Sequence, residues 1–145
     1  MKTRIGLILL WVFLFCGSAA YAGGFVDNGD GTVTDTKTKL MWQKTTESAI
    51  NYEAAILYCK NLTLAGHTDW HLPTKNELMS LVDKNFSKPA IDTGIFPDAI
   101  SFGYWTSTIS ADDPDDIIFI NFVSGKPGNG DKSDTYYVRS VRVIE

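Results

Sequence analysis

Residues 48–82 read SAINYEAAILYCKNLTLAGHTDWHLPTKNELMSLV and place two helix patterns close together. The first half carries apolar side chains at steps of three and four residues: Tyr52, Ala55, Cys59 and Leu62. That spacing predicts a helix from about Ser48 to Ala65 with one buried face. Gly66 is predicted to end this helix, because glycine readily adopts the left-handed conformation that follows many helix C-termini. The next segment, residues 67–73, is predicted to be extended.

A second helix is predicted where Thr74 precedes Glu77 by three residues. This spacing is typical of a capping box, in which the Thr hydroxyl and the Glu carboxylate each accept a hydrogen bond from an otherwise unpaired backbone N–H. Leu78, Leu81 and Val82 continue the apolar pattern, which predicts two to three helical turns. Capping also accounts for Glu77 without a catalytic role.

The segments on either side of these helices have the patterns of short strands. Asn28-Gly29-Asp30-Gly31 predicts the turn of a β-hairpin over residues 25–35, because Asn-Gly and Asp-Gly adopt positive φ at low cost. Further strands are predicted at 40–42, 104–108, 117–123 and 136–144, and loops at 85–102, 110–116 and 124–134. The last loop is predicted to be flexible because of its three glycines and one proline. Two helices among short strands predict an α+β fold.

Residues 1–22 have the pattern of a secretory signal peptide. Lys2 and Arg4 precede the apolar run 5–15, and Ala20-Tyr21-Ala22 fits a cleavage site. Cleavage after Ala22 would leave a single domain, residues 23–145, with 11 Lys+Arg, 17 Asp+Glu and a net charge of −6. We therefore expect an exported protein of the periplasm, the cell exterior or the cell surface. No membrane span is expected after cleavage, because no further long apolar run occurs.

The charge and the cysteine count limit the partners and the stabilising bonds. The full chain has a net charge of −4, which disfavours nucleic acid as a partner because phosphate binding requires a basic surface. Cys59 is the single cysteine expected after cleavage, so no internal disulfide is predicted. A free thiol and an intermolecular disulfide remain alternatives for Cys59. The 4 Trp, 6 Tyr and 8 Phe predict a core rich in aromatic side chains.

No catalytic residue is predicted. A nucleophilic Cys59 would need a basic neighbour, whereas its place on the apolar helix face favours a small core residue. His67 and His71 lie on an extended segment at a separation of about 13 Å, which disfavours a shared zinc ion. Arg139 and Arg142 belong to the final strand pattern, and at least one is predicted to be partly buried and paired with a carboxylate.

Six polar residues are the candidate ligand-binding residues: Asp112, Asp113, Asp115, Asp116, Asn129 and Asp131. The four carboxylates within residues 112–116 repel one another unless water or a cation neutralises them. Calcium prefers such oxygen ligands and is one possible occupant, although no recognised calcium motif is present: EF-hand spacing over the Asp-rich hairpin would place Val26 first and Lys37 last. An ordinary solvated loop is the alternative, and no cofactor is predicted.

Taken in order, several motifs resemble the Lcl C-terminal-domain family, a bacterial domain of unknown function typified by the end of a collagen-like adhesin. The resemblance spans nearly all of residues 23–145, and the ordered set is more specific than any single motif. The matching stretches are DNGDGTVTD (27–35), LMW (40–42), Ala55 with Cys59, DWHLPT (69–74) with Glu77-Leu78, YWTS (104–107) and VRSVR (138–142).

The resemblance implies a C-type-lectin-like fold related to the formylglycine-generating sulfatase-modifying domains, with two helices packed on short, looped, mainly antiparallel sheets. It implies ligand or protein binding, and the Lcl domain is associated with sulfated polysaccharide and with adhesion. Family members commonly carry Cys where this chain has Ser140, so the implied disulfide to Cys59 is absent here. His71 stands where Arg is expected, and a net charge of −6 disfavours a polyanion. The sequence contains neither collagen-like repeats nor a Glu-Pro-Asn motif.

We therefore expect an exported, non-catalytic binding or adhesion module that recognises a glycan, protein or surface ligand through loops between Thr108 and Asp134. Two alternatives remain. One is an enzyme related to the formylglycine-generating group, which would need a redox-active or metal-binding cysteine arrangement. The other is a structural subunit of a surface assembly, driven by an exposed apolar patch. Neither the ligand nor the oligomeric state is predicted.

Overall fold

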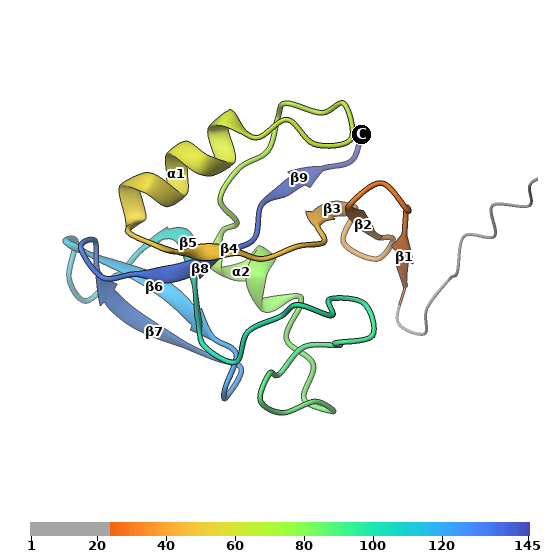
Figure 1. Cartoon of the computed structure of the whole chain (residues 1–145). Helices are drawn as coiled ribbons and strands as arrows, with labels where there is room; N and C mark the ends of the chain where they lie inside the picture. The colour runs from red at the N-terminus through yellow and green to blue at the C-terminus, as the bar shows by residue number, and fades with distance from the viewer. Residues whose placement is uncertain (1–23) are drawn as a thin grey trace, which may run out of the picture.

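The computed structural model describes residues 24–145, which are coloured in Figure 1. Two helices lie among short strands, which confirms the α+β class. The strands are β1 (Phe25–Asp27), β2 (Thr32–Asp35), β3 (Leu40–Gln43), β4 (Glu47–Ile50), β5 (Gly103–Ile109), β6 (Asp116–Asn121), β7 (Lys126–Asp131), β8 (Tyr136–Val138) and β9 (Val141–Val143). The helices are α1 (Tyr52–Asn61) and α2 (Lys75–Met79).

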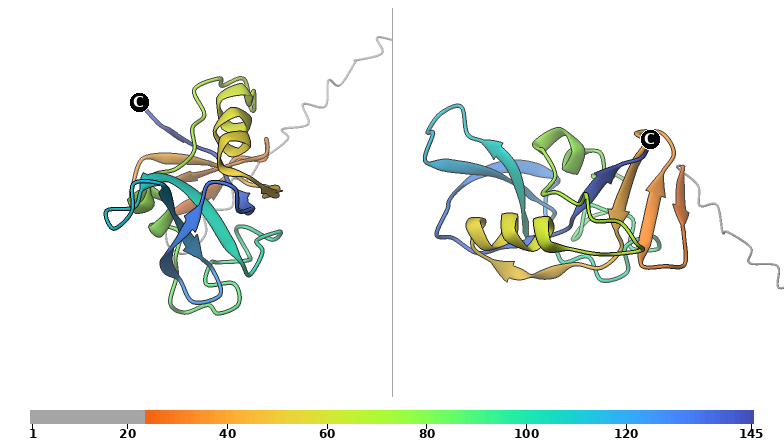
Figure 2. Two further views of the ribbon diagram at one scale, coloured as in Figure 1. Left: turned by 90° about the vertical axis from the view of Figure 1, so that its left-hand side faces the viewer. Right: turned by 90° about the horizontal axis from the view of Figure 1, so that it is seen from above.

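The strands form two sheets that lie toward opposite ends of the molecule (Figure 2). The four-stranded sheet has the order β1-β2-β3-β9 and is antiparallel throughout. The five-stranded sheet has the order β4-β8-β5-β6-β7, in which the single parallel pair is β5 with β8. The sheets are therefore short and mainly antiparallel, as expected.

The predicted hairpin over residues 25–35 is confirmed. Val26 pairs with Thr34, and the connecting turn has Gly29 at φ +73° and Gly31 at φ +88°. The Asp27 and Asp30 carboxylates accept hydrogen bonds from the backbone N–H groups of Gly29 and Thr32. These acidic side chains therefore stabilise the turn, which is the usual role of Asp at such positions.

Helix α1 is shorter than the predicted 48–65. Asn51 caps its start by accepting a hydrogen bond from the Ala54 N–H, and residues 47–50 form strand β4 on the edge of the five-stranded sheet. The helix ends at Asn61, so the prediction that Gly66 stops it was wrong. Gly66 lies instead in a turn closed by the bridge between Leu64 and His67. Pairing with β8 outweighs helix propensity at 47–50 because it provides hydrogen-bond partners for the backbone N–H and C=O groups of this segment.

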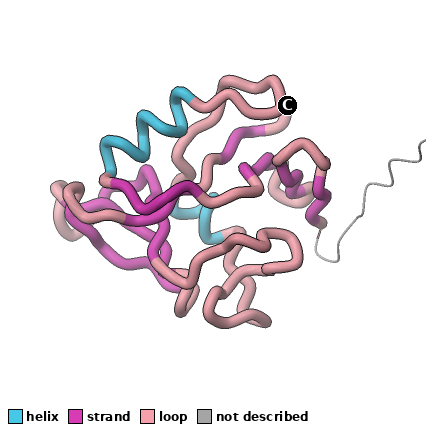
Figure 3. Tube along the Cα trace, viewed as in Figure 1, coloured by secondary structure: helices cyan, strands magenta, loops and turns pink. Residues whose placement is uncertain are grey.

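Helix α2 has the predicted capping box. The Thr74 hydroxyl accepts from the Glu77 N–H at 3.2 Å, and the Glu77 carboxylate accepts from the Thr74 N–H at 2.9 Å. The helix contains five residues, which is fewer than the two to three turns predicted. The chain then enters the long irregular segment that Figure 3 shows between α2 and β5. Ile91, Ile95 and Phe96 anchor this segment, because all three side chains are buried.

Strand β7 occupies most of the segment predicted to be a flexible loop, so that prediction was wrong. Its glycines provide space for aromatic rings. A Cβ atom at Gly128 would lie 2.5 Å from Cζ of Phe119, and one at Gly130 would lie 2.8 Å from Cε2 of Tyr136. Phe119 and Tyr136 stack with their ring centroids 4.3 Å apart. Close packing therefore requires these glycines within an ordered strand.

The predicted final strand over 136–144 is two strands in different sheets. Strand β8 joins the five-stranded sheet and β9 joins the four-stranded sheet, with Arg139 and Ser140 between them. The Arg139 guanidinium is buried and donates to the carbonyl oxygens of Gln43 and Lys44. The buried cation thus links the segment between β8 and β9 to the end of β3 and the residue that follows it.

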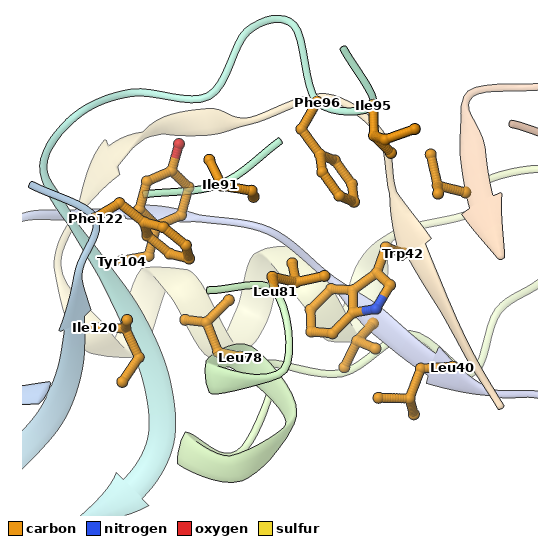
Figure 4. Close-up of a cluster of buried hydrophobic side chains, with 12 residues drawn as sticks. Leu40, Trp42, Leu78, Leu81, Ile91, Ile95, Phe96, Tyr104, Ile120 and Phe122 are labelled. Atoms are coloured by element: carbon orange, nitrogen blue, oxygen red, sulfur yellow. The ribbon is translucent and has the colours of Figure 1, made fainter. Parts of the chain in front are cut away.

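Apolar cores lie on both faces of the five-stranded sheet. Tyr104 and Trp105 are consecutive on β5 and point into different clusters, as alternation in a strand requires. The larger cluster, shown in Figure 4, contains Leu78 of α2, and the smaller contains Ala55 and Cys59 of α1. Cores on both faces account for the strongly apolar composition of β6.

The predicted signal peptide lies outside the described residues. Within residues 24–145, no helix is long and apolar enough to cross a membrane.

Candidate functional site

The candidate residues gather at one end of the five-stranded sheet, which we call the polar end: the turn 110–116, the end of β7 with residues 132–134, and the start of α1. Asp116 and Asp131 lie directly opposite each other in the antiparallel register of β6 and β7. That register brings together the β5–β6 turn and the β7–β8 turn, which lie at the left of Figure 1 beside the start of α1. The Tyr52 N–H donates to the Lys132 carbonyl oxygen and joins α1 to this end.

Backbone hydrogen bonds order the β5–β6 turn. The Ser110 N–H donates to the Asp116 carbonyl oxygen, and the Asp116 N–H donates to that of Asp113. The Asp113 carboxylate accepts from the Asp115 N–H at 2.9 Å. Asp112, Asp113 and Asp115 are exposed, whereas Asp116 is half-buried at the start of β6. The turn therefore presents carboxylates to solvent on a defined backbone.

The β7–β8 turn is ordered by Asp131. Its carboxylate accepts from the Ser133 N–H at 2.7 Å and from the Ser133 hydroxyl at 2.6 Å, which holds the pKa of Asp131 below its usual value. The Asp134 carboxylate accepts from the Asp131 N–H. A surface hollow of about 340 Å³ lies here, lined by Asn51, Glu53, Asp131, Lys132 and Ser133.

Asn129 lies two residues before Asp131 on β7, so the two side chains share a face of the strand. The structure thus places all six predicted residues at or beside the polar end, two of them on a strand rather than a flexible loop. Within residues 24–145, no group of three or more His, Cys, Asp or Glu side chains has an arrangement that could hold a metal ion.

The Cys59 thiol is fully buried, as predicted. It accepts a hydrogen bond from the Ser140 hydroxyl at 3.1 Å. Burial raises the pKa of Cys59 to about 11, despite the opposing effect of that hydrogen bond. The thiol is therefore protonated at neutral pH and shielded from solvent, which are unfavourable conditions for a nucleophile.

His71 and Glu77 form the nearest approach of an imidazole to a carboxylate, with 3.2 Å between Nε2 and Oε2. The same carboxylate caps α2, and the His71 backbone exchanges two hydrogen bonds with Val141. Both residues therefore hold α2 and β9 in place. A shallow hollow of about 330 Å³ borders His71, and its lining residues are Ile56, Lys60, Trp70, His71, Leu72 and Ser107.

The two arginines of the final motif form ion pairs, as predicted. The buried Arg139 lies 3.4 Å from the Asp98 carboxylate, and its guanidinium lies 4.5 Å from the centroid of the Phe96 ring. Arg142 forms a two-pronged contact with Asp69 at 2.7 and 3.1 Å. Both arginines therefore form ion pairs with carboxylates of the same domain.

The Lcl C-terminal domain family matches residues 31–142. This chain belongs to that family. A comparison with curated proteins gives no match. The Lcl C-terminal domain therefore includes both sheets and both helices, apart from strand β1 and the last residue of β9.

Two features of this Lcl C-terminal domain were not predicted from the sequence. Lys132 and Ser133 join the polar end, and a further hollow forms where β4, β8 and the segment before β5 meet. Asn51 directly precedes the apolar periodicity, and Asn is a favoured helix cap, so it could have placed the start of α1. This further hollow depends on three segments that are distant in sequence, so no local pattern indicates it.

Proposed function

We propose that this Lcl C-terminal domain is an exported, non-catalytic binding module of C-type-lectin-like fold that recognises a ligand through its polar end. The signal-peptide pattern supports export. The two-helix α+β architecture and the long irregular segment before β5 support the fold assignment. An adhesive role on the cell surface or in the periplasm is consistent with such a module.

The main support for a binding site at the polar end is Asp116 facing Asp131 across β6 and β7. Like charges directly opposite each other destabilise a strand pair. Asp112, Asp113 and Asp115 add further carboxylates on the adjoining turn. A ligand with a basic surface would be attracted to these carboxylates, whereas a sulfated polysaccharide would be repelled by them. Among the ligand classes that the fold allows, charge complementarity therefore favours a protein or peptide with exposed Lys or Arg.

The chemistry of the remaining candidates supports binding rather than catalysis. Cys59 is a protonated, buried thiol, and Glu77 is committed to capping α2. The alternative of a cysteine-dependent enzyme thus rests on a residue that substrate does not reach. Recognition by loops held on a packed sheet requires only the surface that the polar end provides.

An array of immobilised peptides and glycans of graded charge, probed with the labelled full chain, tests this proposal. We expect basic peptides to be preferred over neutral and acidic ones of equal length. Replacing Asp112→Asn and Asp115→Asn together should weaken binding about tenfold or more, because two charge-assisted contacts become neutral.

The matched control is Asp83→Asn with Asp92→Asn, which removes the same charge from the irregular segment between α2 and β5. This variant should bind within about twofold of the unmodified chain, since surface charges at a distance are screened by salt. Equal losses in the two variants, or a preference for acidic ligands, would contradict recognition at the polar end.

A further inference from the structure

We propose that a further surface hollow, where β4, β8 and the segment before β5 meet, binds an uncharged pyranose unit of a glycan. The hollow has a volume of about 400 Å³ and is lined by Thr46, Glu47, Ser48, Asp98, Ile100 and Tyr137. It shares no residue with the polar end, so this inference extends the proposed binding module and is tested separately from it.

The aromatic side of the hollow is held in a fixed orientation. The Tyr137 ring packs against Tyr104 with centroids 5.6 Å apart, and Phe102 meets it edge-on with centroids 6.2 Å apart. Phe102 itself remains 49% exposed. Exposed aromatic faces carry partial negative charge and attract the weakly positive C–H groups on one face of a pyranose ring. Tyr137 lines the hollow and Phe102 supports it from the side, so the Tyr137 ring offers a face on which a sugar can stack.

The polar side of the hollow supplies hydrogen-bond acceptors beside that face. The Asp98 side chain is 42% exposed and accepts from the Thr46 N–H at 2.7 Å. Glu47 accepts from the Ser48 N–H and hydroxyl through its Oε1 atom. A carboxylate has about four acceptor positions, so both side chains retain capacity for the hydroxyl groups of a sugar.

A buried cation fixes the polar side in place. Arg139 donates to the Thr46 hydroxyl at 2.7 Å and lies 3.4 Å from Asp98. The Tyr104 hydroxyl contacts Thr46 Oγ1 at 3.0 Å and accepts from the Ile100 N–H at 2.9 Å. The two walls of the hollow are therefore tied together, which reduces the ordering that a ligand must impose.

Charge selects the class of glycan. Glu47 and Asp98 place two carboxylates in the hollow, and these repel sulfate and carboxylate groups on a sugar. An uncharged pyranose carries hydroxyl donors for both carboxylates and a C–H face for Tyr137. The arrangement thus combines stacking with a few oriented polar groups, which is the usual composition of a small-molecule site.

Calorimetric titration of the full chain with uncharged gluco-, manno- and chito-oligosaccharides, and with a sulfated heparin oligosaccharide, tests the inference. We expect at least one uncharged oligosaccharide to bind and the heparin oligosaccharide to bind more weakly. Tyr137→Leu should weaken binding about tenfold, because it removes the aromatic face, and Glu47→Gln should weaken it about five- to tenfold. Amide NMR shifts on binding should cluster at residues 46–48, 98–102 and 137.

Ile109→Ala and Glu145→Gln are matched controls, because they remove an exposed apolar side chain and an exposed carboxylate outside the hollow. Both should bind within about twofold of the unmodified chain. Absence of binding by all uncharged oligosaccharides, tighter binding of heparin, or equal effects of the test and control variants would overturn the inference. NMR shifts confined to the polar end would also overturn it while leaving the proposed function intact.

Discussion

The Ser140 hydroxyl donates a hydrogen bond to the Cys59 sulfur across 3.1 Å, and both side chains are fully buried. The two residues lie 81 positions apart and join helix α1 to the segment between β8 and β9. This is the place where the family resemblance implies a disulfide. The polar contact therefore stands where other members would have a covalent bond.

Ser140→Cys should restore that bond. We expect a disulfide to form under oxidising conditions and to raise the free energy of unfolding by about 2–4 kcal/mol, since it closes a long loop in the unfolded chain. Counting free thiols in denaturant and measuring urea unfolding with and without reductant check this prediction. Ser140→Cys combined with Cys59→Ala is the control. Free thiols at both positions after oxidation would show that the geometry does not allow the bond.

Native Cys59 should resist alkylation. With a pKa of about 11, roughly one thiol in a thousand is ionised at pH 8, and burial adds a steric barrier. Iodoacetamide labelling followed by mass spectrometry should give little product from the folded chain and complete product at Cys59 in urea. Similar labelling rates in the two states would restore the cysteine-dependent enzyme as a serious alternative.

Gly128→Ala should destabilise the domain by about 1–3 kcal/mol, because the new methyl group would overlap the Phe119 ring. Asn129→Ala on the same strand is the control and should change stability by less than about 0.5 kcal/mol, since its side chain is exposed. Urea unfolding monitored by tryptophan fluorescence measures both. Equal stability of the two variants would argue that residues 126–131 are loosely packed.

Arg139→Gln should cost about 3 kcal/mol or more, because it leaves the Gln43 and Lys44 carbonyl oxygens without their buried donor. Arg142→Gln should cost less than about 1 kcal/mol, since its partner Asp69 is largely exposed and surface ion pairs contribute little. Chemical denaturation of both variants gives the comparison. Similar losses would mean that Arg139 does not organise the junction between the two sheets.

Local patterns predicted the elements whose determinants are local. The Thr74–Glu77 capping box and the Asn-Gly and Asp-Gly turn satisfy their own backbone groups within a few residues, so the sequence is sufficient. Residues 126–131 were misread because Gly128 and Gly130 are required by rings on other strands. Residues 136–144 were predicted as one strand, whereas they form β8 and β9. The interruption between these strands follows from the distant carbonyl groups to which Arg139 donates.

The same distinction applies to the candidate surfaces. The acidic run at 112–116 was visible in the sequence, and strand register adds Asp131 opposite Asp116. The hollow beside Tyr137 was not predicted, because its walls come from β4, β8 and the segment before β5. Sequence patterns therefore indicated the charge of one surface, while the composition of the other depended on tertiary packing.

The most direct test of ligand recognition at the polar end is amide NMR of the full chain titrated with the tightest-binding peptide from the charge-graded array. We predict that this peptide is basic and that the largest shifts lie in residues 110–116 and 131–134. Preference for an acidic peptide, or large shifts confined to other parts of the domain with these two turns unchanged, would contradict the proposed function.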